Sequence, residues 1–218
     1  MHRVKQVAIK VCGLRDPANI KQVSELHPDY MGFIFYPKSQ RYVGDHFVVP
    51  EIPKAITKVG VFVNESTDVI SRLAEKCSID HVQLHGDETP PQCDELKALG
   101  FTVIKAFGVS EYFDFNVLNR YKGRCNYFLF DTEGKSYGGT GRSFDWDVLQ
   151  KYDQEVPFFL SGGLSLVNAE NALNIKSMNI HALDVNSKFE IEPGVKDVAK
   201  LDELFKLRIN NYELRSNQ

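Results

Sequence analysis

The sequence predicts an α/β fold in which eight βα units form one parallel sheet, and three features support this prediction. Eight short apolar segments recur along the 218 residues, and amphipathic stretches separate them. The segments start about 20 to 30 residues apart, which is the length that a strand, a crossover helix and two short loops need. Several segments are almost wholly apolar, as is typical of strands that helices cover on both faces.

The expected strands can be located from these apolar runs. They are residues 7–12, 30–36, 58–63, 81–85, 102–107, 126–131, 157–161 and 180–185. Eight such units fit either a closed barrel or an open doubly wound sheet, and periodicity does not decide between the two. No linker or shift in composition marks a second domain, so residues 1–209 are expected to form one catalytic domain.

Helix-start signals stand in the stretches between the strands. Asp16 precedes a proline, and Ser66 and Ser165 each precede apolar residues at helical spacing. Side chains of these types cap the first turn of a helix, and proline is favoured directly after the cap. A last helix is expected at about 196–208, followed by a polar tail, residues 210–218, that frays.

Composition and charge exclude several classes of protein. The net charge is −3 and the isoelectric point about 6.1, and neither value indicates a nucleic acid or an anionic membrane as a partner. No apolar run is long enough to span a membrane, and no signal peptide is evident after Met1. The four cysteines lack the paired spacing of metal ligands, so we expect no metal site and reduced thiols in a cytoplasmic protein.

Two glycine-rich segments are the most informative feature of the sequence. Gly138-Gly139-Thr140-Gly141 and Ser161-Gly162-Gly163 each stand between an expected strand and the next helix. Glycine lets backbone N–H groups point at an anion, and the late loops of an eight-fold barrel often bind phosphate. Tight turns would explain either segment alone, but both together favour a phosphate site. Its expected residues are Gly139, Gly141, Gly162, Gly163 and Ser187.

Cys12 and Asp131 are the candidate catalytic residues. Each lies at the carboxyl end of an expected strand, where ligands bind in folds of this class. As a thiolate Cys12 can act as a general base, although a lone cysteine is more often a small buried hydrophobe. Asp131 follows an apolar strand, where poor solvation would favour the protonated form that a general acid needs. A role in capping or in organising a loop explains Asp131 equally well.

Arg41 and His85 are candidates that also have structural interpretations. The guanidinium of Arg41 can bind a substrate carboxylate through two hydrogen bonds, whereas the alternative is an exposed surface arginine. His85 follows an expected strand and is either a base or a structural histidine whose hydrogen bonds are satisfied.

Lys10 lies two residues before Cys12 and therefore on the same face of its strand. If that face points into the core, Lys10 must pair with a carboxylate, which is either Asp184 or Asp131. We hypothesise that Lys10 helps to keep Cys12 ionisable, and we place Asp184 among the substrate-binding residues.

The motifs at the strand ends, taken in order, resemble those of the phosphoribosylanthranilate isomerase family from about Ile9 to Glu190. They are Lys10-Val11-Cys12-Gly13-Leu14, Gly32-Phe33-Ile34-Phe35, Pro37-Lys38-Ser39-Gln40-Arg41-Tyr42-Val43, Val59-Gly60-Val61-Phe62-Val63-Asn64, Val82-Gln83-Leu84-His85-Gly86-Asp87-Glu88, Phe130-Asp131-Thr132, Gly138-Gly139-Thr140-Gly141, Leu160-Ser161-Gly162-Gly163-Leu164 and Leu183-Asp184-Val185-Asn186-Ser187. Each motif is weak alone, whereas all of them in this order are highly specific.

The resemblance implies a single (β/α)8 TIM barrel with a parallel eight-stranded core. It also implies an Amadori rearrangement of N-(5′-phosphoribosyl)anthranilate, without a cofactor, in tryptophan biosynthesis. Cys12 matches the family's general base, Asp131 its general acid and Arg41 the residue that holds the anthranilate carboxylate. The glycines and Ser187 match its phosphate site. Nothing in the sequence decides between a monomer and a homodimer.

The chain departs from the family's usual pattern at three places. Gln40 stands where proline is frequent, which is expected to loosen the loop of Arg41. Arg15 replaces a usual threonine. Asn186-Ser187-Lys188 replaces Ser-Ser-Gly, which affects the part of the phosphate site on the last strand.

Two other functions remain as alternatives. A different phosphosugar-barrel enzyme, such as an indole-glycerol-phosphate synthase, would need a lysine acid at the barrel mouth, for which Lys10 and Lys105 are the candidates. A non-catalytic phosphometabolite-binding barrel would keep the glycine loops but would have no use for both Cys12 and Asp131.

Overall fold

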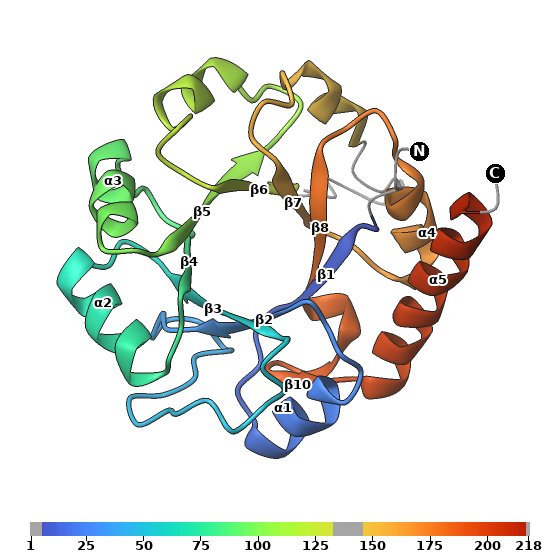
Figure 1. The fold of residues 1–218 in the computed structure, drawn as a ribbon, viewed down its shortest axis with the longest axis horizontal. Helices are drawn as coiled ribbons and strands as arrows, with labels where there is room; N and C mark the ends of the chain where they lie inside the picture. Colours follow the sequence, from blue (N-terminus) through green and yellow to red (C-terminus); the bar gives the residue numbers. More distant parts are fainter. Residues whose placement is uncertain (1–5, 133–145, 217–218) are drawn as a thin grey trace.

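The structure is a computed structural model, and it describes residues 6–132 and 146–216, with side chains for residues 6–131 and 146–209. Eight parallel strands form a closed barrel, because the last strand pairs with the first. Figure 1 looks down this barrel and shows the helices outside the ring of strands. The strands are β1 (Ala8–Val11), β2 (Tyr30–Ile34), β3 (Thr57–Phe62), β4 (His81–Leu84), β5 (Thr102–Val109), β6 (Tyr127–Thr132), β7 (Phe158–Ser161) and β8 (Ile180–Val185). The predicted strands and the closed (β/α)8 barrel are therefore confirmed.

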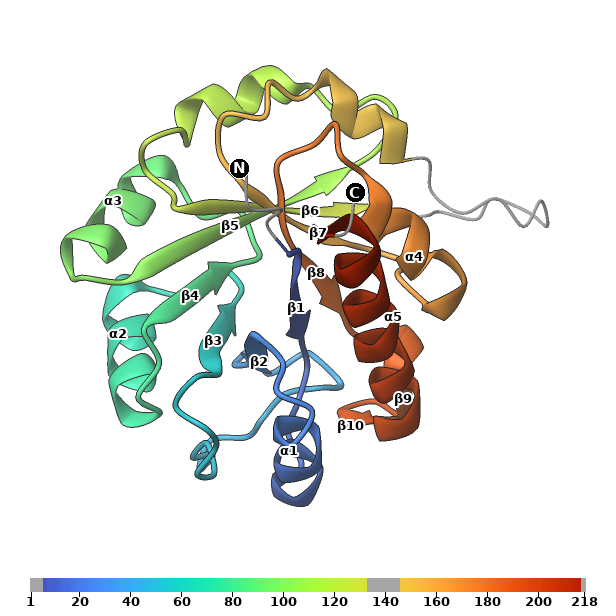
Figure 2. The ribbon, with the colours of Figure 1, turned by 45° about the vertical axis from the view of Figure 1, so that its right-hand side comes forward.

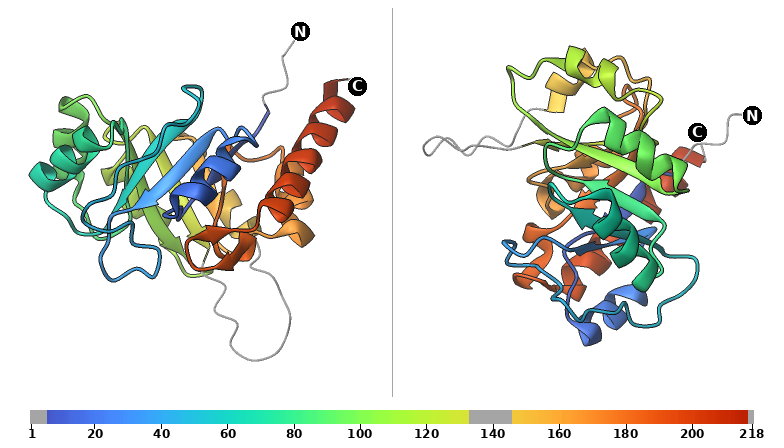
Figure 3. Two further views of the ribbon diagram at one scale, coloured as in Figure 1. Left: turned by 90° about the horizontal axis from the view of Figure 1, so that it is seen from below. Right: turned by 90° about the vertical axis from the view of Figure 1, so that its left-hand side faces the viewer.

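Helices and short 3-10 turns surround the barrel, as the side views in Figure 3 show. They are α1 (Pro17–Ser24), α2 (Thr67–Lys76), α3 (Pro90–Ala98), η1 (Phe115–Arg120), η2 (Trp146–Lys151), α4 (Leu166–Asn174), η3 (Ser187–Phe189) and α5 (Val198–Ser216). The predicted caps are present, because Asp16 Oδ1 accepts from the Asn19 amide at 2.7 Å and Ser66 precedes α2 directly. Helix α5 packs against α1 and α4 and so completes the outer layer (Figure 2).

The connection between β2 and β3 differs from the expected pattern. Residues 35–56, all of which the structure describes, contain no helix. Pro50 and Pro53 lie in this stretch, and proline both removes an amide donor and restricts the residue before it. This crossover is therefore irregular.

The last helix also corrects a prediction. Helix α5 runs from Val198 to Ser216, so most of the segment expected to be a frayed polar tail, residues 210–218, is helical. No glycine or proline interrupts the chain after Val198, and Glu213, Leu214 and Arg215 are good helix formers. Before α5 the chain forms a small antiparallel hairpin of β9 (Glu190–Glu192) and β10 (Val195–Lys196).

Alternate residues of each strand point into the barrel, and they form layers. One inner layer is apolar; its buried residues are Val59, Ile104, Ala106, Leu129, Phe159 and Ala182. Two residues further along their strands, Asp131 pairs in register with Ser161, and Lys10 with Asp184. A polar layer thus lies above the apolar one, at the carboxyl ends of the strands.

Candidate active site

Cys12 directly follows β1 and lies at the barrel mouth. Its amide donates to the Val185 carbonyl at 2.9 Å, and its side chain is 4% exposed. Gly32 makes room for the thiol, because a Cβ at this position would lie 2.7 Å from Cys12 Sγ. Gly13 has a φ of +77°, and a Cβ there would lie 2.6 Å from Cδ of Arg41. Two glycines thus allow the close approach of Cys12 to β2 and of Arg41 to β1.

Lys10 points into the barrel and is fully buried. Its Nζ donates to Oδ2 of Asp184 at 2.8 Å and to Oε1 of Gln83 at 2.7 Å. Of the two partners that the sequence allowed, the structure selects Asp184. The other carboxylate oxygen, Asp184 Oδ1, is buried and has no hydrogen-bond partner among the described residues.

The charge environment of Cys12 bears on its ability to act as a base. Burial raises the pKa of the thiol, nearby Lys10 lowers it, Asp184 raises it and Lys196 lowers it, with the net result that the pKa lies above its usual value. The hypothesised effect of Lys10 thus has the expected direction, but burial outweighs it.

Removal of the Lys10 charge should strongly destabilise the fold. We expect Lys10→Met to lower the free energy of unfolding by about 3–5 kcal/mol, because it leaves Asp184 as an unpaired buried charge. Urea unfolding at neutral pH would measure this. Lys206→Met is the matched control, since Lys206 pairs with Asp202 at 2.6 Å on the surface and is 68% exposed. A loss for Lys10→Met no larger than that of the control would refute the prediction.

Asp131 and His85 face each other across the mouth. His85 Nε2 lies 3.5 Å from Asp131 Oδ2, and the two side chains are 35% and 34% exposed. The expectation that Asp131 lies in a poorly solvated place is therefore wrong. Asp131 is the penultimate residue of β6 and therefore lies at the rim of the barrel, where the neighbouring strands no longer cover its side chain. On the other side of the His85 ring, Nδ1 lies 2.7 Å from Gln83 Nε2.

Arg41 is held by residues that the sequence did not single out. Its Nε and Nη2 donate to both carboxylate oxygens of Glu190 at 2.6 to 3.1 Å, while Nη1 has no partner among the described side chains. Lys196 Nζ, fully buried, donates to Glu190 Oε1 and to Asn186 Oδ1, each at 2.7 Å. Burial raises the pKa of Glu190, but the two cations outweigh it and hold that pKa below its usual value.

Arg15 and Gln40, the two residues near Arg41 that depart from the family's usual pattern, contact each other. Arg15 Nη1 donates to the Gln40 carbonyl at 3.0 Å. Arg15 therefore holds the loop of Arg41 through this hydrogen bond, although Gln40, which stands where proline is frequent, was expected to loosen that loop.

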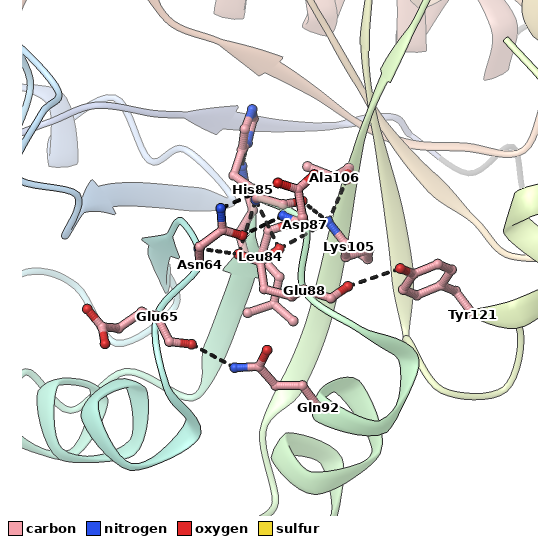
Figure 4. Close-up of polar contacts among 12 residues, drawn as sticks. Asn64, Glu65, Leu84, His85, Asp87, Glu88, Gln92, Lys105, Ala106 and Tyr121 are labelled. Carbon is pink, nitrogen blue, oxygen red and sulfur yellow. Dashed lines mark hydrogen bonds and ion pairs between the residues drawn. The ribbon is translucent and has the colours of Figure 1, made fainter.

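The loop that follows β4 rests on a buried ion pair (Figure 4). Glu88 Oε1 accepts from the Asn64 amide and Oε2 from the Gly86 amide, each at 2.9 Å, and Lys105 Nζ lies 3.1 Å from Glu88 Oε2. Lys105 Nζ also donates to the carbonyls of Leu84, Gly86 and Ala106. Lys105 is 2% exposed and lies on the outer side of the barrel wall, so it supports the loop next to His85 and is not an acid at the mouth.

The expected phosphate site is described in part. Gly162 and Gly163 follow β7 with φ values of +90° and +64°, in the left-handed region that glycine favours. Ser165 then precedes α4, and Ser187 is exposed at the start of η3, just after the neighbouring strand β8. Gly139 and Gly141 lie outside the described residues. Gly162, Gly163 and Ser187 are thus at the ends of adjacent strands, on the rim of the same mouth.

The described residues also lack two further features. Residues 6–132 and 146–216 contain no group of three or more His, Cys, Asp or Glu residues placed to hold a metal ion. In the same ranges, no helix has the length and apolar character needed to cross a membrane.

Comparison with known proteins gives consistent matches along the chain. A family model described as N-(5′-phosphoribosyl)anthranilate (PRA) isomerase matches residues 9–207. The N-(5′-phosphoribosyl)anthranilate isomerase of Phocaeicola vulgatus is 45% identical over 192 residues, which cover 88% of this chain and 92% of the relative. That of Parabacteroides distasonis is 43% identical over 197 residues, covering 88% and 89%.

Solved structures agree with the sequence matches. Phosphoribosyl anthranilate isomerase from Thermotoga maritima has a TM-score of 0.80 at 33% identity, covering 94% of this chain and 99% of that one. A structure of such an isomerase in complex with reduced 1-(o-carboxyphenylamino)-1-deoxyribulose 5-phosphate has a TM-score of 0.79 at 31% identity, with the same coverage. Monomers generated from the dimeric Thermotoga maritima enzyme have a TM-score of 0.76 at 30% identity, covering 93% and 98%.

Proposed function

We infer, since this chain belongs to the N-(5′-phosphoribosyl)anthranilate isomerase family, that it catalyses the family's Amadori rearrangement in tryptophan biosynthesis. The substrate is N-(5′-phosphoribosyl)anthranilate and the product is 1-(2-carboxyphenylamino)-1-deoxyribulose 5-phosphate. One observation carries this proposal: a thiol and a carboxyl, Cys12 and Asp131, lie on opposite sides of one barrel mouth around the polar layer of Lys10, Gln83 and Asp184.

The proposed reaction uses Asp131 as the general acid and Cys12 as the general base. Asp131 protonates the ring oxygen of the ribose, and the ring opens to a Schiff base. The Cys12 thiolate then removes the proton from C2′, and the resulting enolamine tautomerises to the ketone. General acid–base catalysis of this kind contributes about 10²- to 10⁴-fold to a rate.

Binding groups surround the two proposed catalytic residues. Arg41 offers Nη1 to the anthranilate carboxylate while Glu190 holds the rest of its guanidinium. The unpartnered Oδ1 of Asp184 accepts a hydrogen bond from the substrate. Backbone groups of Gly139, Gly141, Gly162 and Gly163, with Ser187, hold the phosphate.

All these residues lie on one chain, in one catalytic domain that includes the barrel and α5, so a monomer is sufficient for the chemistry and a homodimer is compatible with it. The four cysteines are free, as is typical of proteins in a reducing compartment, and we propose a cytoplasmic location.

A genetic experiment tests the proposed activity. Expression of this chain in a tryptophan auxotroph that lacks the isomerase should restore growth without tryptophan. Absence of growth, with the folded protein present in the cell extract, would contradict the proposal.

The pH dependence of the reaction should reflect Cys12. Because the pKa of its thiol lies above the usual value, the thiolate fraction keeps increasing as the pH rises from neutral. In the Asp131→Asn variant, whose side-chain amide does not titrate, we therefore expect kcat/KM, which reports the free enzyme, to rise about tenfold per pH unit through neutral pH. Initial rates from the loss of substrate fluorescence would show this. A plateau that begins below pH 7 would mean that a group with a lower pKa is the base.

Glu190 should matter for substrate binding. We expect Glu190→Gln to raise KM about tenfold with little change in kcat, because Arg41 loses its charged partner and its fixed orientation. Steady-state kinetics would measure both constants. Glu192→Gln on the same hairpin is the control, since Glu192 is exposed. Equal KM values for the two variants would exclude the proposed role of Glu190.

A further inference from the structure

A continuous line of polar side chains connects the two sides of the barrel mouth. It starts at Lys10 on β1, passes through Gln83 on β4 and His85 just after β4, and ends at Asp131 on β6. Lys10 Nζ lies 2.7 Å from Gln83 Oε1, Gln83 Nε2 lies 2.7 Å from His85 Nδ1, and His85 Nε2 lies 3.5 Å from Asp131 Oδ2. Each side chain in the middle of the line contacts two others. The choice of donor and acceptor at one contact therefore determines the choice at the next.

The first link fixes the orientation of the Gln83 amide. An ammonium group can only donate, so the atom of Gln83 that faces Lys10 must be its oxygen. The amide nitrogen then faces His85. Asp184 on β8, which also accepts from Lys10, keeps the ammonium charged in this buried position.

The second link, between Gln83 and His85, determines which ring nitrogen of His85 carries the hydrogen. The Gln83 amide nitrogen has only hydrogens to offer, so His85 Nδ1 must accept and cannot carry a hydrogen itself. The ring hydrogen of a neutral imidazole is then on Nε2. Protonation of Nδ1 would place two donors against each other at 2.7 Å.

We propose that Lys10 and Gln83 hold His85 as its neutral Nε2–H tautomer, and that this N–H positions Asp131. The role of Asp131 in this inference rests on the proposed function. The separation of 3.5 Å is long for a hydrogen bond, and such contacts often shorten when substrate binds.

The tautomer has a chemical consequence for the acid. With His85 donating to Oδ2, the transferable proton of Asp131 is on Oδ1. When Oδ1 gives this proton to the ring oxygen, the carboxylate that forms is stabilised by a donor already in place. A doubly protonated ring, with its single positive charge, would instead favour an ionised Asp131 before the reaction. Besides Asp131, the charged groups near His85 include Asp184, which interacts with it across the mouth, Lys10 behind Gln83, and Asp87 in the same loop.

The tautomer can be measured directly. Long-range ¹H–¹⁵N spectra of the full chain with ¹⁵N-labelled histidine distinguish the two neutral tautomers and the charged ring. Comparison with His85→Gln assigns the His85 signals among the six histidines of the chain. At neutral pH we expect the neutral Nε2–H form in the wild type. An Nδ1–H or doubly protonated His85 would overturn the proposal, whatever the activity.

Variants then test the chain of contacts. Gln83→Glu places an acceptor against Nδ1, and we expect the ring hydrogen to move to Nδ1 or the ring to become charged. If this variant does not fold, Gln83→Met, which removes the donor, should yield a mixture of tautomers. A retained Nε2–H form in a folded Gln83→Glu variant would overturn the proposal.

Kinetics test the effect on Asp131. We expect His85→Leu to lower kcat about tenfold, or about 1.4 kcal/mol in the barrier, with KM unchanged. His85→Gln, which can still donate an N–H, should recover part of this loss. Equal kcat values for the wild type and His85→Leu would refute the role of His85 while leaving the isomerase activity intact. Absence of turnover by the wild type, with the expected tautomer, would instead refute the proposed function alone.

Discussion

Replacing Asp131 with asparagine is expected to lower kcat by about 10²- to 10⁴-fold, because asparagine has no acidic proton to give to the ribose ring oxygen. The shape and polarity of the side chain are nearly conserved, and Asp131 is about one-third exposed, so the fold should not be affected. The loss of substrate fluorescence with N-(5′-phosphoribosyl)anthranilate generated in situ would measure the rate.

Two controls make the Asp131 result specific. Asp94→Asn makes the same chemical change at a half-exposed surface position that pairs with Arg124, and it should leave kcat unchanged. Binding of the reduced product analogue by Asp131→Asn should also persist, since the proposed partners of its phosphate and carboxylate groups are other residues. A rate within a few-fold of the wild type would assign the acid to another group.

Replacing Cys12 with alanine is expected to lower kcat/KM by a similar factor, about 10²- to 10⁴-fold, because no base then faces C2′ of the substrate. Cys77→Ala is the matched control. Cys77 is also buried, at 3% exposed, but it caps the end of α2 on the outside of the barrel. Both variants lose one buried sulfur, so a difference in activity between them reflects the position of the thiol at the barrel mouth. Comparable activity of the two would remove Cys12 from the mechanism.

The sequence was sufficient for the parts of the fold that depend on local patterns. Each strand carries its own apolar run, and Asp16 and Ser66 cap helices as short polar side chains do elsewhere. Closure of the barrel could not be predicted from such local patterns. It requires β1 to pair with β8 across most of the chain, for example Lys10 with Asp184, and no local pattern encodes that pairing.

The same distinction holds for the candidate site. Cys12, Asp131 and Lys10 could be found because position on a strand determines both the face and the end of the barrel where a side chain lies. Gln83 could have been found by the same rule, since it lies on the inward face of β4, two residues before His85. A buried glutamine with no obvious role is a weak signal until Lys10 is known to face it.

Glu190 and Lys196 could not be found from any periodic pattern. They are neighbours because the β9–β10 hairpin folds the chain back, and this hairpin has too few residues to show an alternation. The contact of Arg15 with the Gln40 carbonyl also joins two separate loops. Interactions of this kind depend on tertiary structure alone.

Product analysis of the wild-type reaction would show whether this barrel isomerises phosphoribosylanthranilate with its own acid and base. The purified chain would be incubated with the substrate in a buffer containing EDTA, and the products would be separated chromatographically. We expect complete conversion to 1-(2-carboxyphenylamino)-1-deoxyribulose 5-phosphate with no added cofactor. Tight binding of the reduced product analogue without any conversion would contradict it and would identify a barrel that only binds phosphometabolites.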